Sequence, residues 1–171
     1  REYLSKFKPN CMEDIIALTA LYRPGPMANI PEFISRREGK SKIKYIHSSL
    51  ENILKETYGI IVYQEQVMQI AAQIGGFTLA ESDLMRRAMG KKKKNLMASF
   101  KVKFVEGAAK NKIVKNLAIQ IFELLEKFAQ YGFNKSHAVA YSVISYQTAW
   151  LKYHYPAEFL TANISSDINV T

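Results

Sequence analysis

The stretch of residues 127–141, KFAQYGFNKSHAVAY, constrains the fold most, because it joins two segments of helical periodicity across a sharp turn. The segment before it carries apolar side chains at helical spacing, namely Val114, Leu117, Ala118, Ile121, Leu125 and Phe128. Gly132 offers the backbone freedom that ends such a helix, and Ser136 is a natural N-cap for the next one. The stretch therefore predicts a helix, a turn and a second helix.

The second of these helices carries apolar side chains on more than one face. One face holds Ala140, Val143, Ile144, Gln147 and Leu151. Another holds Val139, Trp150 and Tyr153. A helix with two apolar faces is expected to be packed on more than one side.

The start of this second helix has the composition of an anion site. Its first backbone N–H groups and positive dipole end lie beside Lys135, His137 and the amide of Asn134, which suits a phosphate. From residue types alone, a structural role of these side chains is favoured over an anion site. In that interpretation Asn134 and Ser136 cap the helix, Lys135 is solvated, and His137 fills a partly buried slot.

The positive charge of the chain favours a polyanion as its partner. The formal net charge is +9 at pH 7. Residues 86–103 contain no acidic side chain, and their cations are Arg86, Arg87, Lys91, Lys92, Lys93, Lys94, Lys101 and Lys103. A solvated helix face explains the same run equally well.

Composition narrows the class of protein further. The chain has 171 residues, 48% of them hydrophobic, which is enough for a sizeable core in one domain. It has one cysteine, Cys11, and no apolar run long enough to cross a membrane, so we expect a cytoplasmic protein with no membrane contact. Arg1 opens in the middle of a pattern, so we expect an excised piece of a longer protein.

The remaining pattern is also helical. Asn10 is placed to cap a helix through Ala20, and the PGP segment at residues 24–26 then fixes the position of Arg23. Arg23 either touches nucleic acid or another domain, or satisfies carbonyls at the helix end. Residues 60–63 fit a short strand or a buried lead-in to a helix, and we favour the second.

A capping box at residues 78–81, TLAE, predicts a helix that runs to Gly90. Asp83 lies three and four residues before Arg86 and Arg87 and can pair with either one. The three aspartates of the chain are dispersed, and no Cys/His metal pattern, Walker-type loop or Gly-x-Ser-x-Gly turn is present. We therefore expect no metal site and no catalytic centre in this chain.

Several blocks in a fixed order carry a family resemblance. They are residues 20–27 (ALYRPGPM), 58–68 (YGIIVYQEQVM), 84–93 (LMRRAMGKKK), 127–141, 146–152 (YQTAWLK) and 155–159 (YPAEF). On these blocks the chain resembles, over nearly its whole length, the fingers of bacterial DNA polymerase III alpha subunits, the C-family replicative DNA polymerases. It departs at Gln130, where the family has a small residue, and at Lys112, where glycine is usual.

The resemblance implies an all-α fold, mostly helical with at most a short strand or two. It implies one fingers region over residues 1–171. Within it, residues 1–20 form the helix that leads in from the palm, residues 21–163 form the helical body, and residues 164–171 form a linker.

The resemblance also implies roles for particular residues. The side chains expected to bind the incoming dNTP are Arg86, Arg87, Tyr131, Asn134, Lys135, Ser136 and His137. Those expected to bind template–primer DNA are Arg23, Lys91, Lys92, Lys93 and Lys94. The fragment is expected to bind no cofactor and to be inactive alone, because the palm aspartates that hold Mg²⁺ in the parent polymerase are outside it.

The implied parent is a DNA-directed DNA polymerase, a nucleotidyltransferase that works with a sliding clamp, a clamp loader and a proofreading exonuclease subunit. Two other classes stay open. A non-enzymatic basic helical module that binds nucleic acid explains the charge, and a protein-interaction scaffold explains the tyrosine-rich helices. Salt-dependent DNA binding separates the scaffold from the other two.

Overall fold

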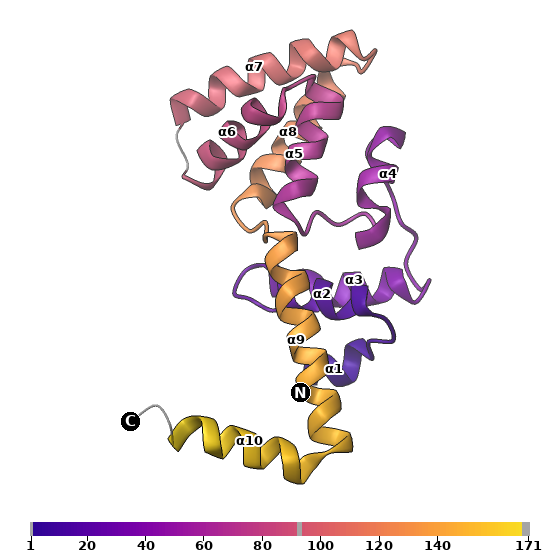
Figure 1. Ribbon diagram of the computed structural model, residues 1–171. Coiled ribbons are helices and arrows are strands. Elements are labelled where there is room, and N and C mark those ends of the chain that lie inside the picture. Colours follow the sequence, from indigo (N-terminus) through magenta and orange to yellow (C-terminus); the bar gives the residue numbers. More distant parts are fainter. Residues whose placement is uncertain (1, 92–93, 169–171) are drawn as a thin grey trace.

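The computed structural model describes residues 2–91 and 94–168, which form helices joined by loops (Figure 1). The α-helices are α1 (Glu2–Phe7), α2 (Met12–Leu21), α3 (Ile30–Arg37), α4 (Glu51–Leu54), α5 (Gln64–Gly75), α6 (Leu79–Gly90), α7 (Lys94–Lys110), α8 (Lys115–Ala129), α9 (Lys135–His154) and α10 (Pro156–Ile168). Short 3-10 helices are Pro26–Asn29, Ser48–Leu50 and Lys55–Thr57. No strand forms within these ranges, and the all-α prediction is confirmed.

The larger of two buried clusters lies among α4 to α8. Its α5 stripe consists of Val67, Ile70, Ala71 and Ile74, which have helical spacing and are fully buried. Phe104 of α7 and Phe122 of α8 pack against each other in the same cluster, with ring centroids 5.5 Å apart. This cluster fixes the position of α6, whose Met85 and Met89 point into it.

A close approach of two backbones sets how α7 crosses α5. A β-carbon at Gly107 would lie 1.8 Å from the carbonyl oxygen of Gly75. Two helices approach this closely only where neither has a side chain in the way. The Gly75–Gly107 pair therefore determines the crossing of α5 and α7.

The smaller buried cluster joins α1, α2 and α3 to Ile60, Val62 and Tyr63 and to Ala138 of α9. Within it, the rings of Phe7 and Phe33 stack with centroids 5.4 Å apart. Beside the rings, Arg37 and the buried carboxylate of Asp14 form an ion pair of 2.6 Å. Arg37 also donates to the carbonyl oxygen of Phe7 at 2.7 Å, so this one side chain holds α1, α2 and α3 together.

Two neighbouring segments connect the clusters. Residues 60–63 are buried and lead directly into α5, as favoured from the sequence, with Tyr63 in the extended conformation. An isolated β-bridge joins Tyr63 to Phe133 in the turn between α8 and α9. The N–H of Gln64 donates to the carbonyl of Phe133 at 2.9 Å, and the N–H of Phe133 donates to the carbonyl of Val62 at 3.0 Å. The α8–α9 turn, residues 130–134, is thereby fixed to the start of α5.

The structure corrects the expected roles of Gly132 and Ser136. Helix α8 ends at Ala129 with Gln130 in the right-handed helical region, and Gly132 has no positive φ. Gly132 lies close to the start of α5 instead, because a β-carbon there would lie 3.1 Å from Cγ of Gln64 and 3.3 Å from its backbone nitrogen. The N-cap of α9 is Asn134, while Ser136 is an exposed residue of the first turn.

Among the described residues, α9 is packed on one side only and not on the several sides expected from the sequence. Along this helix, which the structure describes throughout, only Ala138 and Ser142 are buried. Helix α2 covers this one strip, where the hydroxyl of Thr19 lies 3.1 Å from that of Ser142. The two apolar faces read from the sequence are largely exposed.

Both ends of the chain differ in detail from the expectation. Residues 2–21 form α1 and α2 with a break at residues 8–11, and the backbone N–H of Asn10 donates to Asp14 rather than Asn10 capping α2. At the other end, residues 164–168 continue α10, although they were expected to belong to a linker. No helix in the described ranges is long and apolar enough to cross a membrane.

Candidate functional site

The first group of candidate side chains stands on α6, whose start is firmly capped. The N–H of Thr78 donates to Glu81 at 2.9 Å, and the N–H of Glu81 donates to the hydroxyl of Thr78 at 3.2 Å, which is the predicted capping box. The carboxylate of Glu81 also pairs with Lys103 of α7. These bonds hold the pKa of Glu81 down, to about 2, with the hydrogen bond from Lys103 as the largest cause.

Asp83 binds both arginines of α6. Its Oδ1 accepts from Nε and Nη2 of Arg86 at 3.0 and 2.7 Å, and its Oδ2 lies 2.7 Å from Nη2 of Arg87. The hydrogen bonds from Arg86 are the largest cause of the lowered pKa of Asp83. The side chain of Arg86 is 22% exposed and that of Arg87 is 63% exposed. Arg86 is therefore the more enclosed of the two, and the Arg87 side chain is largely exposed although its Nη2 is paired.

The second group of candidates surrounds the α8–α9 turn. The side chain of Asn134 accepts from the N–H of His137 at 2.8 Å and so caps α9. Two acidic side chains that were not expected here occupy the same helix end. Both carboxylate oxygens of Glu65 lie 3.1 Å from the backbone nitrogen of Lys135, and Glu56 pairs with Nζ of Lys135 at 2.6 Å.

The acidic side chains change what this helix end can bind. Glu65 lies in the first turn of α5 and places its carboxylate at the start of α9 as well. A carboxylate there already neutralises the positive end of the α9 dipole. In sequence, Glu65 is fully explained as a favourable residue at the start of its own helix, so only the long-range contact reveals the second role.

An exposed row of rings runs along the start of α9. The imidazole of His137 lies between the rings of Phe133 and Tyr141, with centroids at 5.4 and 4.3 Å. His137 and Tyr141 are both exposed, as is Tyr131 in the turn. Tyr141 was missed from the sequence, although its four-residue spacing from His137 was a usable signal.

Arg23 is bound to the α8–α9 turn. Its Nη2 donates to the carbonyl oxygen of Tyr131 at 2.6 Å, and its Nε donates to the carbonyl of Ala20 at 3.0 Å. Its guanidinium carbon lies 4.6 Å above the centre of the Phe133 ring. The structure thus shows Arg23 satisfying carbonyls and packing on an aromatic ring, which is the structural alternative given for it above.

The lysines fall into two sets. Lys91, at the C-cap of α6, is exposed, whereas Lys101 pairs with Glu123 of α8 at 2.9 Å and Lys103 pairs with Glu81. Lys92 and Lys93 lie outside the described residues, as does the side chain of Lys94. Further exposed lysines at the opposite end of α7 and the start of α8 are Lys110, Lys112 and Lys115.

The structure places the candidates in two groups rather than one pocket. Arg86, Arg87 and Lys91 belong to the end of α6, and the other described candidates belong to the α8–α9 turn. The end of α6 and this turn both lie on the left side of the molecule in Figure 1. No hydrogen bond or ion pair between the two groups is found among the described side chains.

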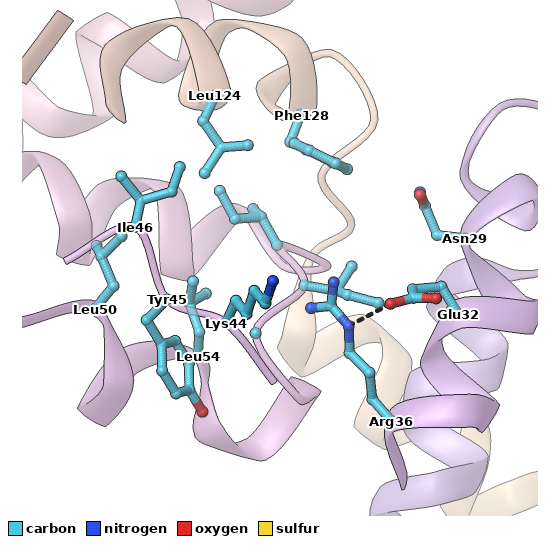
Figure 2. Close-up of a pocket in the computed structure, with 13 residues that line it drawn as sticks. Asn29, Glu32, Arg36, Lys44, Tyr45, Ile46, Leu50, Leu54, Leu124 and Phe128 are labelled. Atoms are coloured by element: carbon cyan, nitrogen blue, oxygen red, sulfur yellow. Dashed lines mark hydrogen bonds and ion pairs between the residues drawn. The ribbon is translucent and has the colours of Figure 1, made fainter. Parts of the chain in front are cut away.

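A separate cavity of about 220 Å³ lies between α3, α4 and α8 (Figure 2). Arg36 and Glu32 form an ion pair of 2.8 Å at one edge, and Leu124 and Phe128 form the apolar wall. None of the described candidate residues lines this cavity. It is therefore not part of the candidate site.

The carboxylates of Asp14 and Asp83 are engaged in ion pairs and do not offer free oxygens to a magnesium ion. Asp14 is paired with Arg37, and Asp83 is bound by Arg86 and Arg87. Within residues 2–91 and 94–168, no three His, Cys, Asp or Glu side chains cluster as metal ligands. Mg²⁺ needs several free oxygen ligands at about 2.0–2.1 Å, which these ion-paired carboxylates do not offer.

The fold and the two groups define a basic, all-helical domain with arginines on a helix end. A family model described as the bacterial DNA polymerase III alpha subunit finger domain matches residues 1–112. The chain belongs to this family.

Curated relatives are similar over nearly the whole chain. DNA polymerase III subunit alpha of Borreliella burgdorferi is 54% identical over 169 residues, 99% of this chain and 15% of the relative. The protein of the same name from Treponema pallidum is 58% identical over 166 residues, 97% of this chain and 14% of the relative. That of Vibrio cholerae is 53% identical over 178 residues, 100% of this chain and 15% of the relative. The chain thus spans about 15% of the length of the relatives it matches.

Proposed function

We propose that this chain is the part of a DNA-directed DNA polymerase that binds the incoming dNTP and the template–primer DNA. The observation that supports the proposal is the arrangement on α6, where Asp83 accepts two hydrogen bonds from Arg86 and pairs with one end of Arg87, which stays largely exposed. A planar guanidinium with free donors matches phosphate oxygens better than an ammonium does. Family membership supports the assignment, because the family is that of the polymerase fingers.

The two arginines act differently in this proposal. Adjacent residues on a helix point about 100° apart, so both cannot lie flat on one small group. Arg87 reaches the triphosphate, and Arg86 holds Asp83 in place and adds positive potential. Charge-assisted bonds to phosphate contribute about 1.5–3 kcal/mol each. They strengthen as negative charge develops during phosphoryl transfer.

The α8–α9 turn has a different part in nucleotide binding. In the proposal the nucleotide site is lined by Tyr131, Asn134, Lys135, Ser136 and His137. The carboxylate of Glu56 already pairs with the ammonium group of Lys135, and that of Glu65 accepts from its backbone N–H. A second anion there would face two carboxylates. The exposed rings of His137 and Tyr131 therefore suit the base or the sugar of the dNTP better than its phosphates.

Template–primer DNA binds, in this proposal, to the basic surface formed by the end of α6 and by α7. Arg23 and residues 91–94 were expected to contribute, and the exposed Lys91 is the one of these lysines whose side chain is described. Lysine contacts to phosphate release counterions and carry no base information. Binding is then independent of sequence and falls steeply with salt.

The rest of the reaction belongs to parts of the polypeptide outside residues 1–171. Carboxylates there would hold the Mg²⁺ ions, which activate the primer 3′-hydroxyl and neutralise the phosphates. The proposed parent is a cytoplasmic nucleotidyltransferase that works with a sliding clamp, a clamp loader and a proofreading exonuclease subunit.

The proposal is tested by separating DNA binding from nucleotide binding in the full-length parent polymerase. A fluorescent primer–template ending in a dideoxynucleotide is titrated with enzyme and Mg²⁺, with and without the next correct dNTP. In the wild type the dNTP should tighten the complex and slow its dissociation by competitor DNA. Arg86→Ala combined with Arg87→Ala should abolish this effect and change the binary Kd little.

A control variant removes the same number of positive charges elsewhere in residues 86–103. Lys91→Ala combined with Lys92→Ala should weaken the binary complex while the dNTP effect persists. Its salt slope should fall by about one for each lysine that no longer neutralises a DNA phosphate. If the arginine variant loses binary affinity as strongly as the lysine variant and keeps the dNTP effect, the arginines bind DNA and the assignment to the nucleotide is wrong.

A further inference from the structure

The cavity between α3, α4 and α8 combines an apolar lining with a cationic rim (Figure 2). Its volume is about 220 Å³. For comparison, a cavity of about 150 Å³ lined by leucine, isoleucine and phenylalanine is large enough to hold a benzene molecule. The apolar side chains of the lining include Ile46, Leu50, Leu54, Ile61, Leu124 and Phe128. The cavity therefore has room for an aromatic ring or a short branched chain.

Arg36 is held at the rim of the cavity by two hydrogen bonds. Its Nε donates to Glu32 at 2.8 Å, and its Nη1 donates to the carbonyl oxygen of Tyr58 at 3.0 Å. These bonds fix the plane of the guanidinium, and among the described residues no hydrogen bond from Nη2 is found. The side chain of Arg36 is only 19% exposed, so water screens its charge less than that of a surface arginine. Arg36 thus offers the N–H groups of Nη2 in a fixed position.

Lys44 supplies a second cation to the same rim. Its side chain is exposed, and within residues 2–91 and 94–168 no ion pair or hydrogen bond of its ammonium group is found. Figure 2 shows this ammonium group and the guanidinium of Arg36 directed toward one another. Like charges placed in this way repel each other, and Glu32 neutralises only one of the two. An anion between Arg36 and Lys44 would remove the repulsion.

The charges of the lining favour a ligand with a single negative charge. Two cations and one carboxylate line the cavity, so its local formal charge is +1. A monocarboxylate matches this charge, whereas a doubly charged phosphate would exceed it and would also face Glu32. The planar guanidinium of Arg36 forms directed, charge-assisted hydrogen bonds with carboxylates. An apolar lining with a few polar groups that orient the ligand is the usual composition of a small-molecule site.

We propose that this cavity binds a small monocarboxylate with an aliphatic or aromatic body. The carboxylate lies between Nη2 of Arg36 and the ammonium group of Lys44, and the body packs against Leu124 and Phe128. None of the lining residues belongs to the proposed nucleotide or DNA surface. A failure of either proposal therefore leaves the other intact.

A ligand in this cavity would contact both segments that hold the α8–α9 turn. Phe128 belongs to the last turn of α8, and Ile61 lies in residues 60–63, which pair with the turn. The cavity also lies between the two buried clusters, because Leu54 belongs to the larger one and Ile60 to the smaller one. A bound monocarboxylate should therefore slow the local opening of these segments.

The first test compares three probes of similar shape on the full-length parent polymerase. They are para-fluorophenylpropanoate, its neutral amide, and the cation para-fluorophenylpropylammonium. Fluorine NMR detects binding as faster transverse relaxation of the probe. The acid should bind with a Kd on the order of 1 mM, as expected for so small a ligand. The amide should bind about tenfold more weakly, and the cation should not bind to this site.

Three variants of the same polymerase assign the binding to the cavity. Lys44→Gln should weaken binding of the acid about three- to tenfold, because one of the two cations is lost. Leu124→Trp should abolish it by filling the cavity. Lys42→Gln is the matched control, since Lys42 is an exposed lysine of the same loop that does not line the cavity, and it should leave the affinity unchanged.

Two results of the NMR experiment would overturn the proposal. The first is binding of the acid that Lys44→Gln and Leu124→Trp leave unaltered, because the acid would then bind elsewhere on the polymerase. The second is equal affinity of the wild type for the acid and the amide, which includes the absence of binding for both. The cavity would then have no preference for an anion.

The second test locates the acid by hydrogen exchange of the wild-type polymerase. With the acid at ten times its Kd, amides of residues 42–61 and 121–133 should exchange up to about tenfold more slowly. The amide probe at the same concentration should slow them no more than about twofold. Residues 156–168 of α10, at the foot of the molecule in Figure 1, provide the internal control and should not change. Unchanged exchange in residues 42–61 and 121–133, or equal slowing by the acid and the amide, would contradict the proposed site.

Discussion

Glu65 places its carboxylate against the start of a helix that begins 70 residues later in the chain, with both oxygens 3.1 Å from the backbone nitrogen of Lys135. One side chain thus serves the positive ends of two helices, α5 and α9. The contact also connects the two buried clusters, because α5 belongs to the larger one and α9 contributes Ala138 to the smaller one.

Glu65→Gln should destabilise the 1–171 chain by about 1 kcal/mol, because the amide keeps the shape but loses the charge that favours the helix dipole. For a chain of this size that corresponds to a fall in Tm of about 2–4 °C. Glu56→Gln is the matched control, since the Glu56–Lys135 pair is exposed and such pairs contribute little. Thermal unfolding by circular dichroism compares the two. Equal Tm values for Glu65→Gln and the wild type would show that the contact is not stabilising.

The buried ion pair between Asp14 and Arg37 should be the costliest polar contact to break. Arg37→Ala leaves the carboxylate of Asp14 buried without its cation, which typically costs about 3–5 kcal/mol. Lys6→Ala is the control, because the Lys6–Glu2 pair lies on the surface. Urea unfolding of the 1–171 chain should show a large shift of the midpoint for the first variant and almost none for the second. Similar midpoints would contradict the assignment.

Gly107→Ala should be far more damaging than its size suggests. The new β-carbon would lie 1.8 Å from the carbonyl oxygen of Gly75, so α5 and α7 would have to separate. Gly90→Ala, also within a helix, meets nothing within 4 Å and should stabilise by about 0.5–1 kcal/mol through helix propensity. Opposite signs for the two variants in the same unfolding assay are the expected result. A neutral Gly107→Ala would show that the helices do not cross as described.

Acid should weaken the attachment of α6 to α7. The pKa of Glu81 is lowered from 4.5 to about 2, with the hydrogen bond from Lys103 as the largest cause. A group with a lowered pKa contributes stability that is present above its unfolded value and is lost as pH falls toward its folded value. The contribution should therefore disappear between about pH 4.5 and pH 2.

Unfolding of wild type and Glu81→Gln across this range provides the measurement. The variant should be less stable at pH 6 and should lose less stability on acidification. Asp83, whose pKa is also lowered, stays unchanged in both proteins and provides the common background. Parallel curves for the two proteins would rule out the role of Glu81.

The helices were predictable from sequence because their signals are local. The capping box at residues 78–81 starts α6, and the spacing of Val67, Ile70 and Ile74 marks the buried stripe of α5. The pairing of Asp83 with both arginines follows from helical spacing alone. All these features involve residues within about one or two helical turns of each other.

The α8–α9 turn was less predictable, because long-range contacts determine its chemistry. It is contacted from distant parts of the sequence by Glu65, Glu56 and Arg23, and no local sequence pattern predicts these contacts. The prediction that α9 is packed on several sides differs from the structure for a related reason. An apolar stripe shows that a face is suited to burial but does not say which part of a protein covers it. Within residues 2–91 and 94–168, α2 covers the buried strip of α9 and leaves its other faces exposed.

The proposed division of labour between Arg86 and Arg87 is tested most directly by single-nucleotide incorporation. The full-length parent polymerase is used on a saturating primer–template. Arg87→Ala should lower kcat/KM for the correct dNTP by roughly ten- to a hundredfold, with part of the loss in kcat, since the phosphate contact strengthens in the transition state. Arg86→Ala should cost less and act mainly through KM, because Arg86 acts through Asp83. DNA Kd should change little in either variant. Normal nucleotide kinetics with weakened DNA binding in both variants would contradict a role in nucleotide binding and assign both arginines to the DNA-binding surface.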